Sequence, residues 1–367
     1  MLRRPRLSPS GEPKEASLNM KTEHLLIIRL SAMGDIAMTV PVIRALATQY
    51  PHIRITVLSK EFARTFFENL SPNISFMSAD FKEEYKGIHG LNKLYRRLHA
   101  KHFTAVADLH DVLRSKYLRL RFRCCGYRIR YINKHRKLRR QLTRERNKIK
   151  QPIPTAFNNY ADVFAALGYP IELSNNPSWN EERKQETSRS SFPAPHSPNK
   201  NIGIAPFAAH KGKIYPTEKM EEVIATLCQR HPDCHIFLFG GGANEKAVFD
   251  KWCAKFPNCI NASARLGGIQ QELDCMRDLN VMLSMDSANM HLASLAGTPV
   301  VSVWGATHPY GGFMGWRQSE DNAVQVNLDC RPCSIYGKKP CHRGDYACMN
   351  SIGPAQIVAQ IEPFITQ

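Results

Sequence analysis

The chain has 367 residues, of which 43% are hydrophobic, and it carries a formal net charge of +18. This length allows two domains of ordinary size, and no apolar run approaches the roughly 20 residues that a membrane-spanning helix needs. Residues 1–20 lack the apolar centre of a secretory signal peptide. Eleven cysteines in a chain without such a signal indicate a reducing compartment.

Most of the positive charge lies in one block. From Arg114 to Lys150, sixteen lysines and arginines stand against the single acid Glu145, so this segment holds +15 of the +18. Such a block suits the phosphates of a nucleic acid or an anionic membrane surface with phosphorylated lipid headgroups. Because no RRM, KH, helix-turn-helix or zinc-finger pattern accompanies it, the nucleic-acid alternative is the weaker one.

The first half of the chain alternates short apolar runs with stretches of helical spacing. We expect strands at residues 24–30, 53–58, 74–77 and 104–108, and helices at 36–50, 60–69, 91–99 and 158–169. This order is typical of a doubly wound parallel sheet. In the basic block, apolar residues partly alternate with arginine, so part of it is expected to be strand: Leu118, Leu120, Phe122, Ile129 and Tyr131. Residues 135–150 look like an exposed basic loop or helix.

The turn after the first strand holds the first candidate residue. Ser31-Ala32-Met33-Gly34-Asp35 follows that strand, and a helix with an early Pro41 comes next. Asp35 therefore lies at the C-terminal edge of the sheet, where ligand sites of α/β folds form. It is either a general base or a helix N-cap, and the local pattern alone favours the cap.

The second half repeats the alternation. A strand at 201–205, a loop with two lysines at 206–216, a helix at 218–230 and a strand at 235–239 lead into Gly240-Gly241-Gly242. A glycine triplet at a strand end lets a ligand approach the backbone closely. Glu245 follows at the start of the next helix, where it holds a ribose diol or simply faces the helix N-terminus favourably.

Residues 284–309 form a strand–helix–strand pattern near the end of the chain. Asp286 and Ser287 stand where the helix begins and can cap it. A helix N-terminus at the carboxyl ends of parallel strands suits a phosphate. Each half is therefore expected to be a Rossmann-like α/β domain, with a cleft between the two. We expect a disordered extension at 1–22, an N-terminal domain at 23–175, a linker at 176–200, a C-terminal domain at 201–350 and a last helix at 351–367.

Three stretches carry a resemblance to a known family: IRLSAMGDIAMTVPVIRAL at 28–46, GIAPFAAHKGKIYP at 203–216 and SMDSANMHLASLAGTPVVSVWGATHP at 284–309. With these motifs, the chain resembles the ADP-heptose:lipopolysaccharide heptosyltransferases of glycosyltransferase family 9 over roughly residues 24–365. The resemblance implies the GT-B architecture, in which two Rossmann-like domains face each other across a cleft.

The resemblance also implies residue roles. It makes Asp35 the catalytic base, against the local preference for a cap. On the acceptor side it places Ser31, Met33, Gly34, Asp108, His110 and Arg114. On the donor side it places Lys213, Gly240, Gly241, Glu245, Asp286, Ser287, Ala288 and His291. Ala208 and Ala209 stand where many members have hydroxyl residues, so His210 and Lys211 become candidates for part of the phosphate grip. Ala288 stands where glycine is common.

The implied activity is inverting transfer of heptose from ADP-heptose to the Kdo/heptose inner core of lipopolysaccharide. No cofactor is required for it, and the chain has no DxD-type metal motif near the donor loop. We expect a cytoplasmic monomer, peripheral to the cytoplasmic face of the inner membrane, where the basic block meets the anionic lipid A-core acceptor. The alternatives are a family 9 enzyme using another nucleotide sugar and, more remotely, a nucleic-acid-binding protein.

Four cysteines stay outside this account. Cys330-x2-Cys333-x7-Cys341-x6-Cys348 has zinc-like spacing. Free or redox-sensitive thiols, a structural zinc site and disulfides all remain open at this point, and the reducing compartment argues against disulfides.

Overall fold

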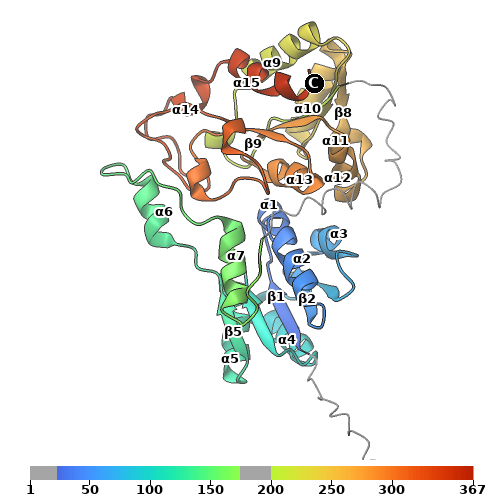
Figure 1. Cartoon of the computed structure of the whole chain (residues 1–367), viewed down its shortest axis with the longest axis vertical. Helices are drawn as coiled ribbons and strands as arrows, with labels where there is room; N and C mark the ends of the chain where they lie inside the picture. Colours follow the sequence, from blue (N-terminus) through green and yellow to red (C-terminus); the bar gives the residue numbers. More distant parts are fainter. Residues whose placement is uncertain (1–22, 174–199, 367) are drawn as a thin grey trace, which may run out of the picture.

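The structure is a computed structural model, and it describes residues 23–173 and 200–366. The extension expected at 1–22 and nearly all of the linker expected at 176–200 lie outside the described residues. The described chain forms two parallel sheets covered by helices, one in each half (Figure 1). This confirms the expected α/β class with two Rossmann-like domains. No helix in the described part of the chain is long and apolar enough to cross a membrane.

The N-terminal sheet has the strand order β3-β2-β1-β4-β5. Its strands are β1 (His24–Ile28), β2 (Arg54–Ser59), β3 (Ile74–Ser78), β4 (Ala105–Asp108) and β5 (Arg128–Tyr131). Its helices are α1 (Met33–Ala37), α2 (Val40–Gln49), α3 (Arg64–Phe67), α4 (Gly87–His99), α5 (Leu113–Cys124), α6 (Arg136–Thr143) and α7 (Ala156–Ala165), with a 3-10 turn at Glu61–Ala63. Every residue of β1 is buried, because this strand is central in the sheet.

The C-terminal sheet has the order β11-β10-β9-β6-β7-β8. Its strands are β6 (Asn201–Ala205), β7 (His235–Leu238), β8 (Cys259–Asn261), β9 (Val281–Met285), β10 (Val300–Val303) and β11 (Ala323–Val324). Its helices are α9 (Thr217–Arg230), α10 (Ala243–Lys255), α11 (Ala262–Arg265), α12 (Ile269–Arg277), α13 (Ala288–Ala296), α14 (Ala347–Asn350) and α15 (Pro354–Ile361). Further 3-10 turns lie at Lys211–Lys213, Pro309–Gly311, Glu320–Asn322 and Glu362–Phe364.

Two helices differ from the sequence prediction. The helix expected at 36–50 is divided into α1 and α2, since Pro41 has no N–H with which to bond the carbonyl of Ala37. The helix expected at 60–69 is a 3-10 turn followed by the four residues of α3.

The basic block contains more helix than expected. Leu118 and Phe122, which were expected in a strand, lie one turn apart on α5, and both are fully buried. Their spacing of four residues places both on one face of a helix. Only Ile129 and Tyr131 belong to a strand, β5, and residues 136–143 form α6.

The two domains meet where α1 and α13 pack against each other (Figure 1). Gly34 makes the close approach possible, because a Cβ at this position would lie 2.7 Å from Cδ2 of His291. One hydrophobic cluster continues across the junction and includes Ile36 of α1 and Met290 of α13. The N-termini of α1 and α13 therefore lie side by side at the junction of the two domains.

Candidate functional site

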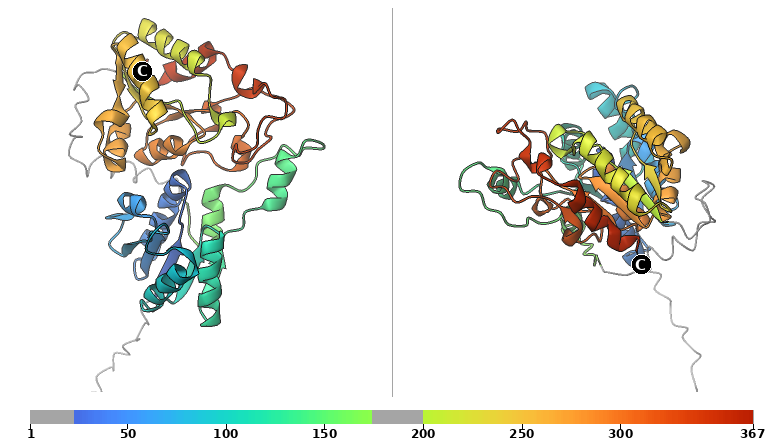
Figure 2. Two further views of the ribbon diagram at one scale, coloured as in Figure 1. Left: turned by 180° about the vertical axis from the view of Figure 1, so that it is seen from behind. Right: turned by 90° about the horizontal axis from the view of Figure 1, so that it is seen from above.

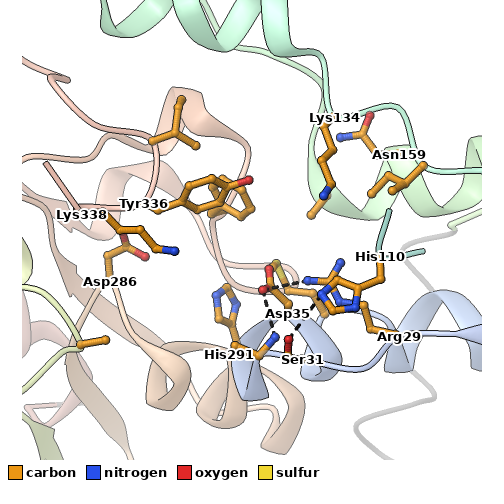
Figure 3. Close-up of a pocket in the computed structure, with 18 of the residues that line it drawn as sticks. Arg29, Ser31, Asp35, His110, Lys134, Asn159, Asp286, His291, Tyr336 and Lys338 are labelled. Atoms are coloured by element: carbon orange, nitrogen blue, oxygen red, sulfur yellow. Dashed lines mark hydrogen bonds and ion pairs between the residues drawn. The ribbon is translucent and has the colours of Figure 1, made fainter. Parts of the chain in front are cut away.

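A cavity of about 490 Å³ lies between the domains at the N-termini of α1 and α13. Loops at the carboxyl ends of strands from both sheets line it, as expected for a ligand site of this fold class. Figure 3 shows side chains of both domains pointing into it. Of the residues predicted for the site, those that line it are Ser31, Gly34, Asp35, His110, His210, Lys213, Asp286 and His291.

Asp35 is the third residue of α1, and its carboxylate faces the cavity. It is therefore not the N-cap that the local pattern suggested; Ala32 holds that position. Oδ2 of Asp35 pairs with Nη2 of Arg29 at 2.8 Å and accepts a hydrogen bond from the Ala32 N–H at 3.2 Å. Burial acts to raise the pKa of this carboxyl, but Arg29 and the Ala32 N–H outweigh it and lower the pKa. Asp35 is consequently ionised at neutral pH.

Arg29 lines the candidate site, although the sequence pattern did not single it out. It follows β1, it is buried, and its Nη1 donates to the carbonyl oxygen of Leu109 at 2.6 Å. The sequence does contain a sign of this role: Arg29 is the only charged residue between His24 and Ser31 in an otherwise apolar run. A cation in a buried strand needs an acidic partner, and Asp35 is that partner.

His110 stands beside this pair. Its Nδ1 accepts a hydrogen bond from the Leu30 N–H at 3.3 Å, so Nε2 carries the proton and faces Oγ of Ser31 at 3.4 Å. Burial, followed by the positive charge of Arg29, lowers the pKa of His110 to about 3. The imidazole is therefore neutral and acts as a hydrogen-bonding group rather than a cation.

The C-terminal domain contributes an ion pair. Nζ of Lys213 lies 2.9 Å from Oδ2 of Asp286, and the hydroxyl of Thr307 donates to the same oxygen at 2.7 Å. Asp286 precedes α13, and Ser287 is the N-cap residue, although its side chain makes no capping hydrogen bond. The first N–H groups of α13 are thus free to bind an anion next to Lys213.

His291 joins the two halves of the site. It lies in the second turn of α13 and lines the cavity, and its Nδ1 is buried without a hydrogen-bond partner in the described structure. Burial lowers the pKa of His291 to about 4 against the opposite pull of Asp286 and Asp35. A neutral imidazole with an unpartnered nitrogen is suited to receive a ligand hydrogen bond.

Several predicted site residues lie elsewhere. Nζ of Lys211 stacks over the ring of Tyr346 at 5.0 Å. Glu245 accepts hydrogen bonds from the N–H groups of Gly241 and Gly242 at 2.7 and 3.4 Å. Its carboxylate therefore caps the N-terminus of its own helix. The residues of this group that do not line the cavity are Met33, Asp108, Arg114, Lys211, Gly240, Gly241, Glu245, Ser287 and Ala288.

Asp108 and Arg114 have structural partners. Asp108 is fully buried, accepts the N–H groups of His110 and Asp111 at 2.9 and 3.0 Å, and pairs with Arg119 at 3.3 Å. It therefore shapes the loop that carries His110. Arg114 stacks over the ring of Phe81 at 5.2 Å, away from the cavity.

Several other lining residues were not singled out from the sequence, among them Lys134, Arg139 and Tyr336. Lys134 and Arg139 belong to the basic block, and Tyr336 belongs to the cysteine-containing loop. No local signal separates Lys134 and Arg139 from the other fourteen cations of the block. Their position depends on the path of the chain between β5 and α7, which the sequence pattern does not specify.

The four cysteines of the C-terminal loop line one small hollow together with Arg331. All four are free thiols: Cys330, Cys333, Cys341 and Cys348. In the described residues, no three histidine, cysteine or acidic side chains are placed to hold a metal ion. Arg331 donates to the carbonyl oxygens of Gly305 and Thr307 at 2.6 and 3.0 Å and so fixes this loop to the segment that follows β10.

Comparisons with known proteins agree with this arrangement. Residues 91–346 match the family model of glycosyltransferase family 9 (heptosyltransferase). The lipopolysaccharide core heptosyltransferase OpsX of Haemophilus influenzae is 24% identical over 308 residues, which are 82% of this chain and 84% of that protein.

Two solved structures show the same fold. A family 9 glycosyl transferase from Veillonella parvula has a TM-score of 0.67 at 17% identity, covering 94% of this chain and 98% of the other. The ADP-heptose lps heptosyltransferase II of E. coli has a TM-score of 0.63 at 16% identity, covering 94% of this chain and 99% of the other.

Proposed function

The chain belongs to glycosyltransferase family 9, the heptosyltransferase family, and from this premise we propose that it transfers heptose from ADP-heptose to the Kdo/heptose inner core of lipopolysaccharide. Transfer is proposed to invert the anomeric centre and to need no metal ion. The observation that supports this most is the divided cavity. An ionised carboxylate from one domain and a lysine of the other, paired with the aspartate that precedes α13, line the same space.

Asp35 is suited to act as the base. Both of its polar contacts use Oδ2, so Oδ1 is left to accept the proton of an acceptor hydroxyl. A carboxylate of lowered pKa is a weak base. The proton therefore moves to it as the new glycosidic bond forms and the attacking oxygen becomes acidic. Attack from the side of Asp35, opposite the leaving group, inverts the anomeric centre.

The donor is proposed to lie against the C-terminal domain. Its pyrophosphate accepts hydrogen bonds from the first N–H groups of α13 and pairs with the ammonium of Lys213. These groups stabilise the negative charge that develops on the leaving ADP. The unpartnered Nδ1 of His291 lies at this junction and is proposed to hydrogen-bond the donor. The name of the E. coli structural relative includes ADP-heptose, which favours this donor over other nucleotide sugars.

Removal of the base tests this function. Asp35→Asn should still bind ADP within about two-fold of the wild type, but should lose transfer by at least roughly 10³-fold, since only the proton acceptor is gone. Transfer is measured by mass with ADP-, GDP- and UDP-sugars and truncated core lipids, in buffer containing EDTA.

Each arm of this assay has a contradicting result. Retained transfer by Asp35→Asn would refute the role of Asp35, and wild-type transfer from UDP- or GDP-sugars only would refute the donor. Loss of wild-type transfer in EDTA, with recovery on adding a divalent cation, would refute metal independence.

A further inference from the structure

The cavity is lined by more cations than its two ion pairs contain. Its charged lining residues are the cations Arg29, Lys134, Arg139, Lys213 and Lys338 and the acids Asp35 and Asp286. Arg29 pairs with Asp35, and Lys213 pairs with Asp286. The remaining three cations form no ion pair with any residue in the ranges 23–173 and 200–366. The cavity is therefore built for more than one anionic group.

Two of these cations come from the N-terminal domain, on the same segment. Lys134 and Arg139 lie between β5 and α7, and Figure 3 shows Lys134 on the opposite side of the cavity from His291. Nζ of Lys134 donates to the carbonyl oxygen of Asp111 at 2.9 Å, which leaves two of its three hydrogens for other partners.

Arg139 is held in place by aromatic side chains of the other domain. Its guanidinium lies 5.3 Å from the ring centre of Phe313 and 5.5 Å from that of Tyr336, and its Nη1 donates to the Tyr336 hydroxyl. Its Nε is buried and has no partner in the described structure. A guanidinium fixed by stacking is already oriented, so little side-chain entropy is lost when an anion binds it.

The segment that carries Arg139 is itself anchored to the C-terminal domain. Nζ of Lys148 donates to the carbonyl oxygens of Asp329, Cys330 and Pro332 at 3.2, 2.6 and 3.0 Å. The Ile153 N–H donates to the Tyr310 carbonyl at 3.0 Å. Arg139 therefore keeps its position only while the two domains are close to each other.

We propose that Lys134 and Arg139 form an anion subsite that binds a carboxylate or phosphate group of the sugar acceptor. This inference rests on the proposed glycosyl transfer. The subsite shares the N-terminal domain with Asp35, whereas Lys213 and α13, which are proposed to hold the donor, belong to the other domain. The planar guanidinium of Arg139 matches a carboxylate or phosphate with two parallel hydrogen bonds. Anchoring the acceptor there brings its hydroxyl to Asp35.

Charge-removing variants test the subsite. Arg139→Gln and Lys134→Gln should each raise the KM for a de-acylated Kdo acceptor roughly 10- to 100-fold, the loss of one charged hydrogen bond. The Kd for ADP should stay within two-fold, because the donor residues are untouched. Lys137→Gln is the matched control, since Lys137 is an exposed cation of the same helix that does not line the cavity. Arg139→Lys should recover part of the loss.

A binding measurement separates this subsite from the transfer activity. Free Kdo and inorganic phosphate are titrated calorimetrically into enzyme saturated with ADP. If Kdo binding weakens in both Gln variants, the subsite binds a carboxylate. If phosphate binding weakens in both, it binds a phosphate. Each of these results supports the subsite even if the enzyme transfers no heptose. The subsite is refuted if neither anion binds the ADP-saturated wild type, or if both variants, folded by thermal melting, bind as the wild type does.

Discussion

The Arg29–Asp35 ion pair sets the charge state of the carboxylate that we propose as the base. With its pKa lowered, Asp35 adds to stability at neutral pH, and this contribution is lost as the pH falls through its folded-state pKa. The same shift keeps Asp35, the proposed base, ionised over the whole neutral range. Arg29 thus makes the carboxylate available and at the same time makes it a weaker base.

Replacing Arg29 separates these two effects. Arg29→Gln should move the acid limb of the kcat/KM profile to higher pH, because burial raises the pKa of Asp35 once the cation is gone. The free energy of unfolding at pH 7 should fall by about 2 kcal/mol, because a partly buried carboxylate loses its hydrogen-bonded partner. Initial rates across a pH series and denaturant unfolding measure both. In Arg29→Lys, the acid limb of the kcat/KM profile should stay closer to that of the wild type. An acid limb that does not move in Arg29→Gln would contradict this role of Arg29.

The sequence allowed the motif residues of the site to be predicted, but not their partners. Asp35, Lys213, Asp286 and His291 follow strand ends, and strand ends of parallel sheets meet at one edge. Arg139 meets Tyr336 across 197 positions of sequence, and no local pattern records such a contact. Asp108 ends β4 and Glu245 comes after β7, yet both accept hydrogen bonds from backbone N–H groups of their own loops. A position near a strand end thus predicts that an acidic residue lies near the site, but not the direction in which its carboxylate points.

At the scale of elements, the contact of α1 with α13 controls how closely the two half-sites approach. A Cβ on Gly34 would lie 2.7 Å from Cδ2 of His291 and 3.3 Å from the Cα of Ala288. The helix α1 has only five residues because Pro41, in the first turn of α2, cannot donate the hydrogen bond that would continue α1. The sequence predicts the glycine turn and the α13 helix, but the meeting of the two helices depends on how the domains pack.

Gly34→Ala should therefore lower kcat at least about ten-fold, since α1 and α13 must separate and carry Asp35 away from the donor. Overpacking at this contact should cost about 1–3 kcal/mol of the free energy of unfolding. Steady-state kinetics and thermal unfolding measure the two effects. Gly353→Ala is the control, because a Cβ at Gly353 has no neighbouring atom within 4 Å. An unchanged kcat in Gly34→Ala would show that this contact does not limit catalysis.

At the scale of the whole molecule, the basic block divides into two parts. One part has partners: Arg119 binds Asp108 and Asp111, and Lys148 binds backbone carbonyls of the other domain. The other part is exposed on α6 and the turn after it, where Arg140, Arg144 and Arg146 form no ion pair or side-chain hydrogen bond within the described structure. Figure 2 shows α6 beside the C-terminal domain, well away from the far end of the N-terminal sheet. The net charge alone could not distinguish these parts.

The exposed part is the surface that we expect to meet an anionic membrane. Each basic residue near such a surface contributes about 1 kcal/mol, so the triple change of Arg140, Arg144 and Arg146 to Gln should weaken binding to vesicles containing phosphatidylglycerol roughly 100-fold. Sedimentation with these vesicles and with neutral phosphatidylcholine vesicles measures the effect. A triple Gln variant of Lys86, Arg96 and Lys101, at the ends and on the exposed face of α4, removes the same charge from the opposite end of the domain and should bind as the wild type does. Equal losses in both variants would mean that net charge, not α6, attracts the protein. Tighter binding of the wild type to RNA than to the anionic vesicles would favour a nucleic-acid partner instead.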